Sequence, residues 1–389
     1  MKRSSRLGER MSSWTGLDGV DGRSHDAWRS LAWQVMLVGG VYFLAAAAGI
    51  LLSRQPQGIS SIWLANALAL GWFLRRGTGA WPLHFVAIFA SGLAANILFG
   101  HPPTISVVLT AANLFELGLA LGLLRLWTGP LGPDTLTVAS YLKLQAVAAA
   151  IAPAVAGVAA AVIVNVINGW AISDLWWLWW SGSAIGAVTI LPIVMTADRR
   201  ALQGIAGGKS AAAFIGFALL SVGFAYAALT MIAHPFVVVG MPLVLAALWT
   251  TPFATALNLL ACMAVVTVAA HLGQLVGVSG TQTIHSISIN FFAALTIFPA
   301  FCISLIVAEL RREQVRIGAS ELRFRQAMEH SAIGMALIGL DGSWQRINRA
   351  LSDMLGYMPE ELGRLTFQDI THPADLAADL HLLEKTIAG

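Results

Sequence analysis

The stretch between Lys209 and Glu309 contains no Asp, Glu, Lys or Arg. A soluble fold of that length needs a charged surface, so this stretch must face something other than water. Its apolar runs reach about 20 residues, the length at which a helix crosses the ~30 Å hydrocarbon core of a bilayer. The runs do not alternate with polar residues, which excludes a β-barrel. We therefore predict an all-α polytopic membrane bundle whose helices satisfy their own backbone hydrogen bonds.

Composition agrees with this prediction. Hydrophobic residues make up 57% of the chain and charged residues 11%, against about 25% charged in soluble domains. The basic excess is small, so the predicted partner is the lipid bilayer and not a nucleic acid. Residues 1–29 are followed by no cleavage site and are predicted to be a cytoplasmic tail, not a signal peptide. Cys262 and Cys302 lie in apolar runs and indicate no disulfide framework.

Ten membrane spans are predicted, and loop charges give their direction. The spans are residues 30–53, 59–74, 80–99, 105–127, 138–167, 175–197, 211–232, 236–250, 253–272 and 287–308. With a cytoplasmic N-terminus, the basic loop residues fall inside except Arg54, as the positive-inside rule demands. This predicts a multi-pass protein of the inner (cytoplasmic) membrane with both termini in the cytoplasm. The eighth and ninth spans share an uncharged connection, so a re-entrant pair there stays open.

Glu116 is the best candidate for a signal or ligand site, because it is the only acidic residue deep inside a predicted span. An intramembrane carboxylate faces the protein interior or a wet cavity and indicates function by default. Asn113 lies on the same helical face, and Asn66 and Asn96 lie at comparable depth on neighbouring spans. Two interpretations stay open. The cluster is either a hydrogen-bonded clamp between helices or a site for a ligand, an ion or a proton.

A tryptophan cluster opens the sixth predicted span. It consists of Trp176, Trp177, Trp179 and Trp180. The cluster is typical of an interfacial aromatic belt, and the alternative is a stacking surface for an aromatic or lipidic ligand. The external connections are too short to form a domain, so anything sensed is sensed within or beside the bilayer.

After Ala308 the composition becomes rich in Glu, Arg and Gln. Residues 309–330 are predicted to continue the last span as a signalling helix. Leu310, Ile317 and Phe324 repeat every seven residues, which favours a parallel homodimer. In residues 331–389, Asp341-Gly342 is a hairpin turn signal between two short strands, and short helices follow.

The membrane region resembles the bacterial membrane-associated sensor family called MASE, type one, over residues 31–308. The matching residues are Trp63, Trp81, Pro82, Asn96, Asn113, Glu116, Arg125, Trp179, Trp180, Gly186 and Pro192. The chain departs from that family's pattern at Leu64, where a Pro is common, and at Ser183, near the usual place of an Asp. The resemblance implies a sensory input module, and it adds Trp63, Trp179 and Trp180 to the candidate site.

Residues 331–389 resemble the N-terminal part of a PAS domain of the S-box type. The matching residues are Gly334, Asp341, Gly342, Asn348, Leu355, Gly356, Tyr357, Glu361, Leu362, Asp369, Ile370, Thr371, His372 and Pro373. A PAS fold needs further strands, so we expect a truncated cytoplasmic α+β domain. In both families a diguanylate cyclase, a cyclic-di-GMP phosphodiesterase or a histidine kinase usually follows. None of their catalytic motifs occurs in residues 1–389.

No cofactor and no metal are predicted. Haem is the one cofactor hypothesis, with His84 in the membrane region and His381 in the PAS-like region as candidate ligands. Two rival functions remain. A transporter would explain the Gly and Pro residues inside spans, but no internal repeat is visible. An enzyme acting on lipid would need a catalytic cluster at membrane depth, and none is visible.

Overall fold

A computed structural model describes residues 24–55, 58–76, 81–128, 131–132, 135–232, 235–272 and 282–388. The chain divides into two compact units, residues 1–309 and 310–389, which we describe separately. Most of the predicted tail, residues 1–23, lies outside the described residues. Its last residues belong to the first described helix, which begins at Ser24.

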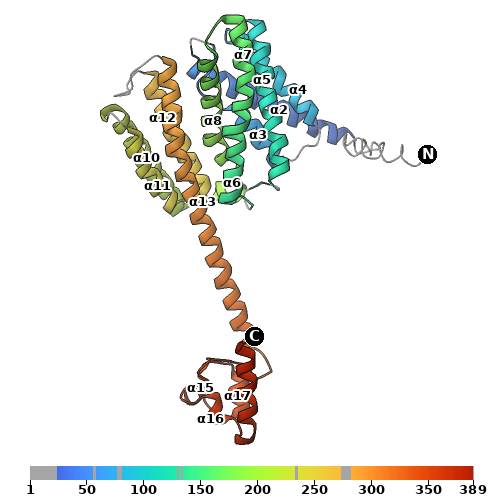
Figure 1. Ribbon diagram of the computed structural model, residues 1–389, viewed down its shortest axis with the longest axis vertical. Helices are drawn as coiled ribbons and strands as arrows, with labels where there is room; N and C mark the ends of the chain where they lie inside the picture. The colour runs from blue at the N-terminus through green and yellow to red at the C-terminus, as the bar shows by residue number, and fades with distance from the viewer. Residues whose placement is uncertain are drawn as a thin grey trace, which may run out of the picture. The chain divides into compact units, whose positions relative to one another are not determined.

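The first unit is built of helices, as the uncharged apolar runs predict (Figure 1). They are α2 (Ser24–Ser53), α3 (Ala65–Arg76), α4 (Trp81–Leu98), α5 (Pro103–Trp127), α6 (Val138–Gln145), η1 (Ala146–Ile151), α7 (Ala152–Asn168), α8 (Ile172–Thr196), α9 (Arg199–Ala206), α10 (Gly208–Met231), α11 (Pro235–Trp249), α12 (Pro252–His271) and α13 (Gln282–Glu329).

Eight helices of the described residues are long and apolar enough to cross a membrane, not ten. The second and eighth predicted spans are the exceptions. Helix α3 has 12 residues because residues 59–64 ahead of it are not helical. Helix α11 has 15 residues and contains Pro242. Apolar composition could not reveal these interruptions.

The second predicted span still joins the two ends of the bundle. At one end, the Ser61 N–H donates to Ser53 O of α2 over 2.9 Å. At the other, Arg75 Nη1 donates to Val194 O near the end of α8 over 2.9 Å. Non-helical backbone at membrane depth is tolerated where protein buries it, and Ile59, Ser60, Ser61 and Trp63 are all buried. An extended segment and a half-helix therefore complete this span together.

The fifth predicted span contains a wider turn. Residues Ala146–Ile151 form a π-helix between α6 and α7. Pro153 lies just after it and has no N–H to donate, so the regular bonding pattern of the helix is interrupted there. Such π turns occur often at functional sites.

Two groups of helices make up the first unit. Helices α5, α7 and α8 lie side by side, and α3 packs between α5 and α8 (Figure 1). Helices α10, α11 and α12 form a second group, which α12 joins to α8 and α2. Large buried side chains such as Tyr42, Tyr141 and Phe301 fill the interior. Exposed Leu, Val and Ile side chains cover the outer faces, as expected where helices meet lipid.

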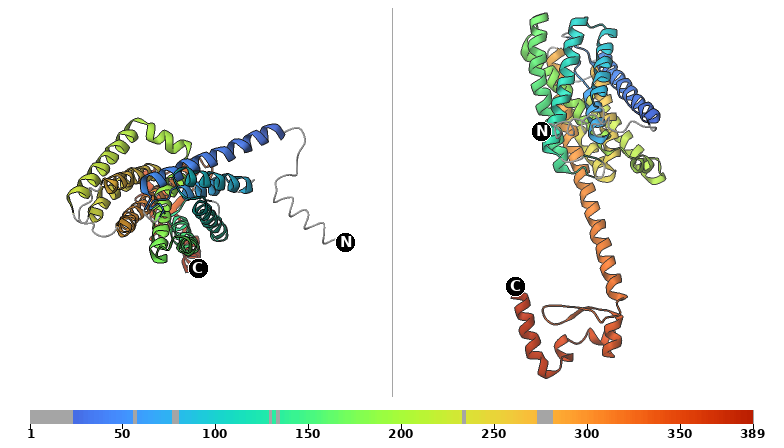
Figure 2. Two further views of the ribbon diagram at one scale, coloured as in Figure 1. Left: turned by 90° about the horizontal axis from the view of Figure 1, so that it is seen from above. Right: turned by 90° about the vertical axis from the view of Figure 1, so that its right-hand side faces the viewer.

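Helix α13 has 48 residues and is continuous in the right-hand view of Figure 2. It begins within the first unit and ends within the second.

The second unit has a hairpin and four further helices. Strand β1 (Ala336–Ile338) pairs antiparallel with β2 (Trp344–Ile347), as the Asp341-Gly342 turn predicts. Gly342 has φ +87°, a conformation that favours glycine. Helices α14 (Arg349–Leu355), α15 (Pro359–Leu362), α16 (Phe367–Ile370) and α17 (Pro373–Ala388) follow.

Asn348 holds the hairpin and the helices of this unit together. Its side chain accepts from Leu351 N and Met335 N and donates to Met328 O and Ile333 O, each over 2.8–2.9 Å. Asp341 accepts from the Ser343 hydroxyl and N–H, and these bonds lower the pKa of its carboxyl. The PAS assignment of residues 331–389 stays a prediction.

Membrane orientation is our first prediction. Arg54, Phe99 and Gly100 meet at one end of the bundle, and Arg75 and Val194 meet at the other. With the N-terminus cytoplasmic, we expect reporter fusions after Gly100 and Gly169 to read outside. Fusions after Arg76, Arg125 and Arg200 should read inside. The measurement is paired alkaline phosphatase and fluorescent-protein activity, and a cytoplasmic reading after Gly169 would contradict the predicted alternation.

Candidate functional site

A buried hydrogen-bond network surrounds Glu116, at the middle of α5. Asn66 Nδ2 of α3 donates to Glu116 Oε1 over 2.9 Å. Trp179 Nε1 and Ser183 Oγ of α8 donate to Oε2 over 2.8 and 3.1 Å. Glu116 is 4% exposed. One carboxylate therefore holds three helices together.

Asn66 extends the network to a fourth helix. Its Oδ1 accepts from the Tyr42 hydroxyl of α2 over 2.9 Å and from Trp63 Nε1 over 3.3 Å. Its Nδ2 also donates to Asn113 Oδ1 over 2.9 Å. Asn113 lies one turn before Glu116 and donates to Leu109 O over 2.9 Å. The side-chain amide of Asn66 thus connects the aromatic residues to the carboxylate.

The non-helical segment 59–64 reaches this network because two glycines of α8 let it approach. The Trp63 N–H donates to Gly182 O over 3.1 Å. A Cβ at Gly186 would lie 2.0 Å from Trp63 O, and one at Gly182 would lie 3.1 Å from Ser60 O. Only glycine permits such close approach of two backbones. Gly182 and Gly186 therefore place Trp63 beside Asn66.

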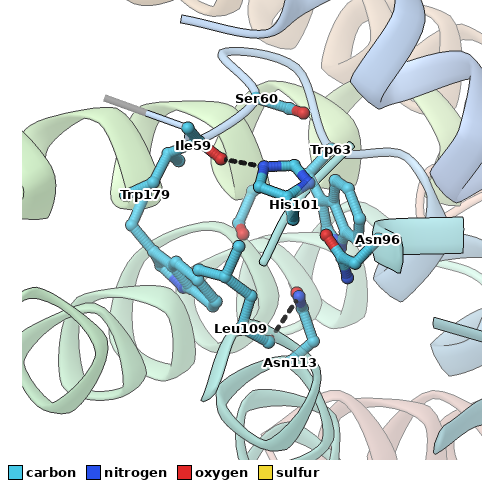
Figure 3. A pocket seen from close by; sticks show the side chains of 10 residues that line it. Ile59, Ser60, Trp63, Asn96, His101, Leu109, Asn113 and Trp179 are labelled. Atoms are coloured by element: carbon cyan, nitrogen blue, oxygen red, sulfur yellow. Dashed lines mark hydrogen bonds between the residues drawn. The ribbon is translucent and has the colours of Figure 1, made fainter. Parts of the chain in front are cut away.

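A pocket of about 30 Å³ lies beside the network. Figure 3 shows side chains of segment 59–63, α4, α5 and α8 converging on it, among them Trp63, Asn96, Asn113 and Trp179. Ser183 also lines it, so the pocket meets a residue bonded to Glu116. A buried water needs about 10–15 Å³ of such space and two to four polar partners. The pocket has room for one or two waters or a ligand of that size.

His101 lies at the same pocket, in the connection between α4 and α5. Its Nε2 is 2.6 Å from Gly58 O (Figure 3), and burial lowers the pKa of this imidazole. A neutral imidazole that donates from Nε2 keeps Nδ1 as an acceptor. Within the described residues Nδ1 is buried and has no partner.

The hydrogen-bond partners of Glu116 differ in whether they suit an ionised or a protonated carboxyl. Asn66 Nδ2 and Trp179 Nε1 can only donate, which suits an ionised carboxylate. The Ser183 hydroxyl can donate or accept, so it is the one direct partner that can adapt if the carboxyl takes up a proton. Among the described residues, no group of three or more His, Cys, Asp or Glu side chains is arranged for a metal ion.

The structure brings together most of the candidate residues from the sequence. Glu116, Asn113, Asn66, Trp63 and Trp179 form the network. Asn96 lines the pocket but donates to Gly92 O and Thr110 Oγ1 over 2.9 and 3.3 Å.

Trp180 does not join the network. It stacks on Trp176 at an interplanar angle of 3°, with ring centroids 5.9 Å apart. It lines a different pocket, together with Trp177 and α13 residues. Residues four apart share a helical face, so Trp176 and Trp180 form one face of α8 while Trp179 and Ser183 form another.

The two haem candidates lie in different units. His84 is buried in α4, where its ring meets the edge of Phe73 with centroids 5.8 Å apart. His381 is exposed on α17. The haem hypothesis stays a prediction for each of them separately.

Three residues of the site were missed by sequence reasoning. Tyr42 stands in an apolar run and resembles an ordinary lipid-facing aromatic. Ser183 was noted only as a departure from the family pattern, yet its hydroxyl bonds Glu116. His101 lies in a short loop, and the two prolines after it were the available signal for an ordered connection.

The membrane region of the chain is similar to known proteins. The family model described as MASE1 matches residues 34–311. The "Probable diguanylate cyclase DgcE" of Escherichia coli (strain K12) is 27% identical over 357 residues, which cover 90% of this chain and 32% of that protein. The chain thus spans about a third of the length of that relative. No solved structure matches.

Proposed function

Because the chain belongs to the MASE1 family of membrane sensory domains, we propose that the network around Glu116 is where this signalling input module registers its signal. The observation that carries the proposal is the buried carboxylate, which is held by donors from α3 and α8 beside a small pocket. A proton or a small ligand there changes the side-chain hydrogen bonds that join α3, α5 and α8. Such a cluster has two discrete bonding states, as a switch requires.

A physical route leads from this network toward α13. Segment 59–64 carries Trp63 to Asn66, and two residues earlier the Ser61 carbonyl accepts from Asn290 Nδ2 of α13. Nineteen residues further along α13, Glu309 Oε1 accepts from the Val138 N–H over 2.7 Å. A shift of segment 59–64 therefore changes a contact of α13 directly. We propose that α13 relays this change toward residues 331–389.

Residues 331–389 are the proposed PAS relay, on the basis of their S-box residues and of the hairpin followed by helices. The proposed output is cyclic-di-GMP turnover by an enzyme in a longer protein that carries this chain. The similarity to a protein named as a diguanylate cyclase favours synthesis among the possible outputs.

Insertions into α13 test the proposed relay, and they are our second prediction. Each residue of an α-helix adds about 100° of rotation. Two alanines after Gly318 should turn everything that follows by about 200° and change output severalfold. Seven alanines add nearly two full turns and should restore most of it. Cyclic-di-GMP would be measured with residues 1–389 joined to a diguanylate cyclase domain. Equal output from the parent and both insertions would reject the relay.

A parallel homodimer is our third prediction. Leu310, Ile317 and Phe324 are 61%, 58% and 47% exposed on the part of α13 that lies in the second unit. This apolar row on a charged helix needs a partner, and a second copy supplies a matching row. We expect Ile317→Cys to form intermolecular disulfides under mild oxidation. Arg316→Cys, one position away, should crosslink less. Equal crosslinking of the two variants would contradict the proposed interface.

A transporter is the second candidate function that the geometry favours. An extended segment followed by a half-helix, with a polar pocket beside it, is an arrangement that transporters use. The discriminating measurement is uptake of small ions and solutes into vesicles that contain the purified chain. Catalysed uptake that depends on Glu116 would replace the sensory interpretation.

A further inference from the structure

Two adjoining cavities lie between α2, segment 59–64 and α12. One has a volume of about 450 Å³ and the other about 250 Å³. Five residues line both of them, and these are Leu52, Ser53, Ile62, Met263 and Thr267. The two cavities therefore adjoin each other, and we call them together the α2–α12 groove.

The lining of the groove changes from polar at one end to apolar at the other. The larger cavity is lined by polar residues that include Ser53, Arg54, Ser61 and Asn290. The smaller cavity is lined mainly by apolar residues of α2 and α12, such as Ala48, Leu260 and Val268. A polar end that continues into an apolar channel matches a molecule with a headgroup and a hydrocarbon chain.

The apolar end of the groove reaches the outer face of the bundle. Leu52, Val268 and Leu272 line it and are 60%, 55% and 60% exposed. Exposed apolar side chains on a membrane helix face hydrocarbon, so a lipid can enter from the side without passing through water. This favours a lipid of the surrounding bilayer over a solute that arrives from the aqueous phase.

The charge of the residues that line the groove indicates which class of lipid it can bind. Arg54 lines the polar end, and among the residues that the structure describes no Asp or Glu lines either cavity. Arg54 Nη1 and Nη2 donate to Phe99 O and Gly100 O over 2.8 and 3.3 Å. A guanidinium has five N–H donors, so three remain after these two bonds. No ion pair of the described residues involves Arg54, and its charge therefore stays available for an anion.

We propose that the α2–α12 groove binds one anionic phospholipid, with its phosphate on Arg54 and an acyl chain between α2 and α12. Its headgroup would lie beside Ser61 and Asn290, the residues that join segment 59–64 to α13. Lipid binding does not depend on the signalling role proposed above. Only the consequence for α13 rests on that role.

Native mass spectrometry of the full chain tests the binding. Phosphatidylglycerol and phosphatidylcholine with identical acyl chains would be added to the detergent-purified protein. We expect one phosphatidylglycerol to be retained per chain and phosphatidylcholine to be retained about tenfold less. Both lipids carry a phosphate, but the choline ammonium cancels its charge and would be repelled by Arg54. Equal retention of both lipids would overturn the proposal. Displacement of phosphatidylglycerol by equimolar oleate would instead assign the groove to a free fatty acid and overturn it too.

Two variants locate the lipid, each with a matched control. Arg54→Gln keeps a side-chain amide donor beside Phe99 O and Gly100 O but removes the charge, and it should lower retention about tenfold. Arg125→Gln removes a charge at an exposed helix end elsewhere and should change nothing. Ala264→Phe fills the acyl end, whereas Ala212→Phe makes the same change on an exposed face of α10. Retention that survives both groove variants, with unfolding temperatures unchanged, would place the lipid elsewhere and reject the groove as its site.

Discussion

Replacing Gly186 with alanine is expected to disrupt the packing of segment 59–64 against α8 and to lower the free energy of unfolding by about 2–3 kcal/mol. The added Cβ would lie 2.0 Å from the Trp63 carbonyl oxygen and 2.8 Å from its carbon. The obstacle is backbone, so no side-chain rotation relieves it. The segment must move away from α8, and the bond from Trp63 N–H to Gly182 O is lost with it.

A graded series of glycine variants makes this prediction specific. Gly182→Ala should have a smaller effect, because its Cβ would lie 3.1 Å from Ser60 O and Ser61 O. Gly216→Ala and Gly223→Ala in α10 are the controls, since no heavy atom lies within 4 Å of either added Cβ. These controls should be neutral or stabilise by about 0.5–1 kcal/mol, because alanine is the better helix former. The measurement is thermal unfolding in detergent, and equal stability of Gly186→Ala and Gly216→Ala would contradict the close approach.

The fold was predictable where one property of the chain determined it. Long apolar runs without charge can only become membrane helices, and eight of the described helices fit that rule. The break before α3 was not predictable, because residues 59–64 are as apolar as their neighbours. What makes them extended is the close fit to Gly182 and Gly186, which lie more than a hundred residues later in the chain. A hydropathy profile does not reveal a contact between residues that lie so far apart in the sequence.

The candidate site was likewise predictable from the sequence only in part. Glu116 stood out because a carboxylate inside an apolar span needs a reason, and Asn113 followed from helical spacing. Trp180 was included because it matches the family pattern together with Trp179. Helical periodicity contained enough information to separate them, since Trp179, Ser183 and Gly186 share one face of α8. Tyr42 was hidden, because a tyrosine in an apolar run has the same pattern whether it faces lipid or Asn66.

Glu116→Leu is expected to destabilise the first unit by about 2–4 kcal/mol, because three hydrogen bonds disappear together. Trp179 Nε1 and Ser183 Oγ then lose their partner in a buried site, while Asn66 Nδ2 keeps Asn113 Oδ1. Glu116→Gln should lose about 1 kcal/mol, since its amide NH2 must face at least one donor. The fold should survive in Glu116→Gln, but the titratable group at the centre of the network is gone.

The two Glu116 variants separate a structural clamp from a signal site when stability and output are measured together. If Glu116 registers the signal, Glu116→Gln changes cyclic-di-GMP output and its pH response although unfolding changes little. Asn258→Leu is the control, because it removes a buried bond of 3.0 Å to Ser221 Oγ in the other helix group. It should lower stability without changing the pH response. If the output and pH response of Glu116→Gln equal those of the parent, the carboxylate is only a clamp between α3, α5 and α8. The sensing site must then lie elsewhere in the membrane unit.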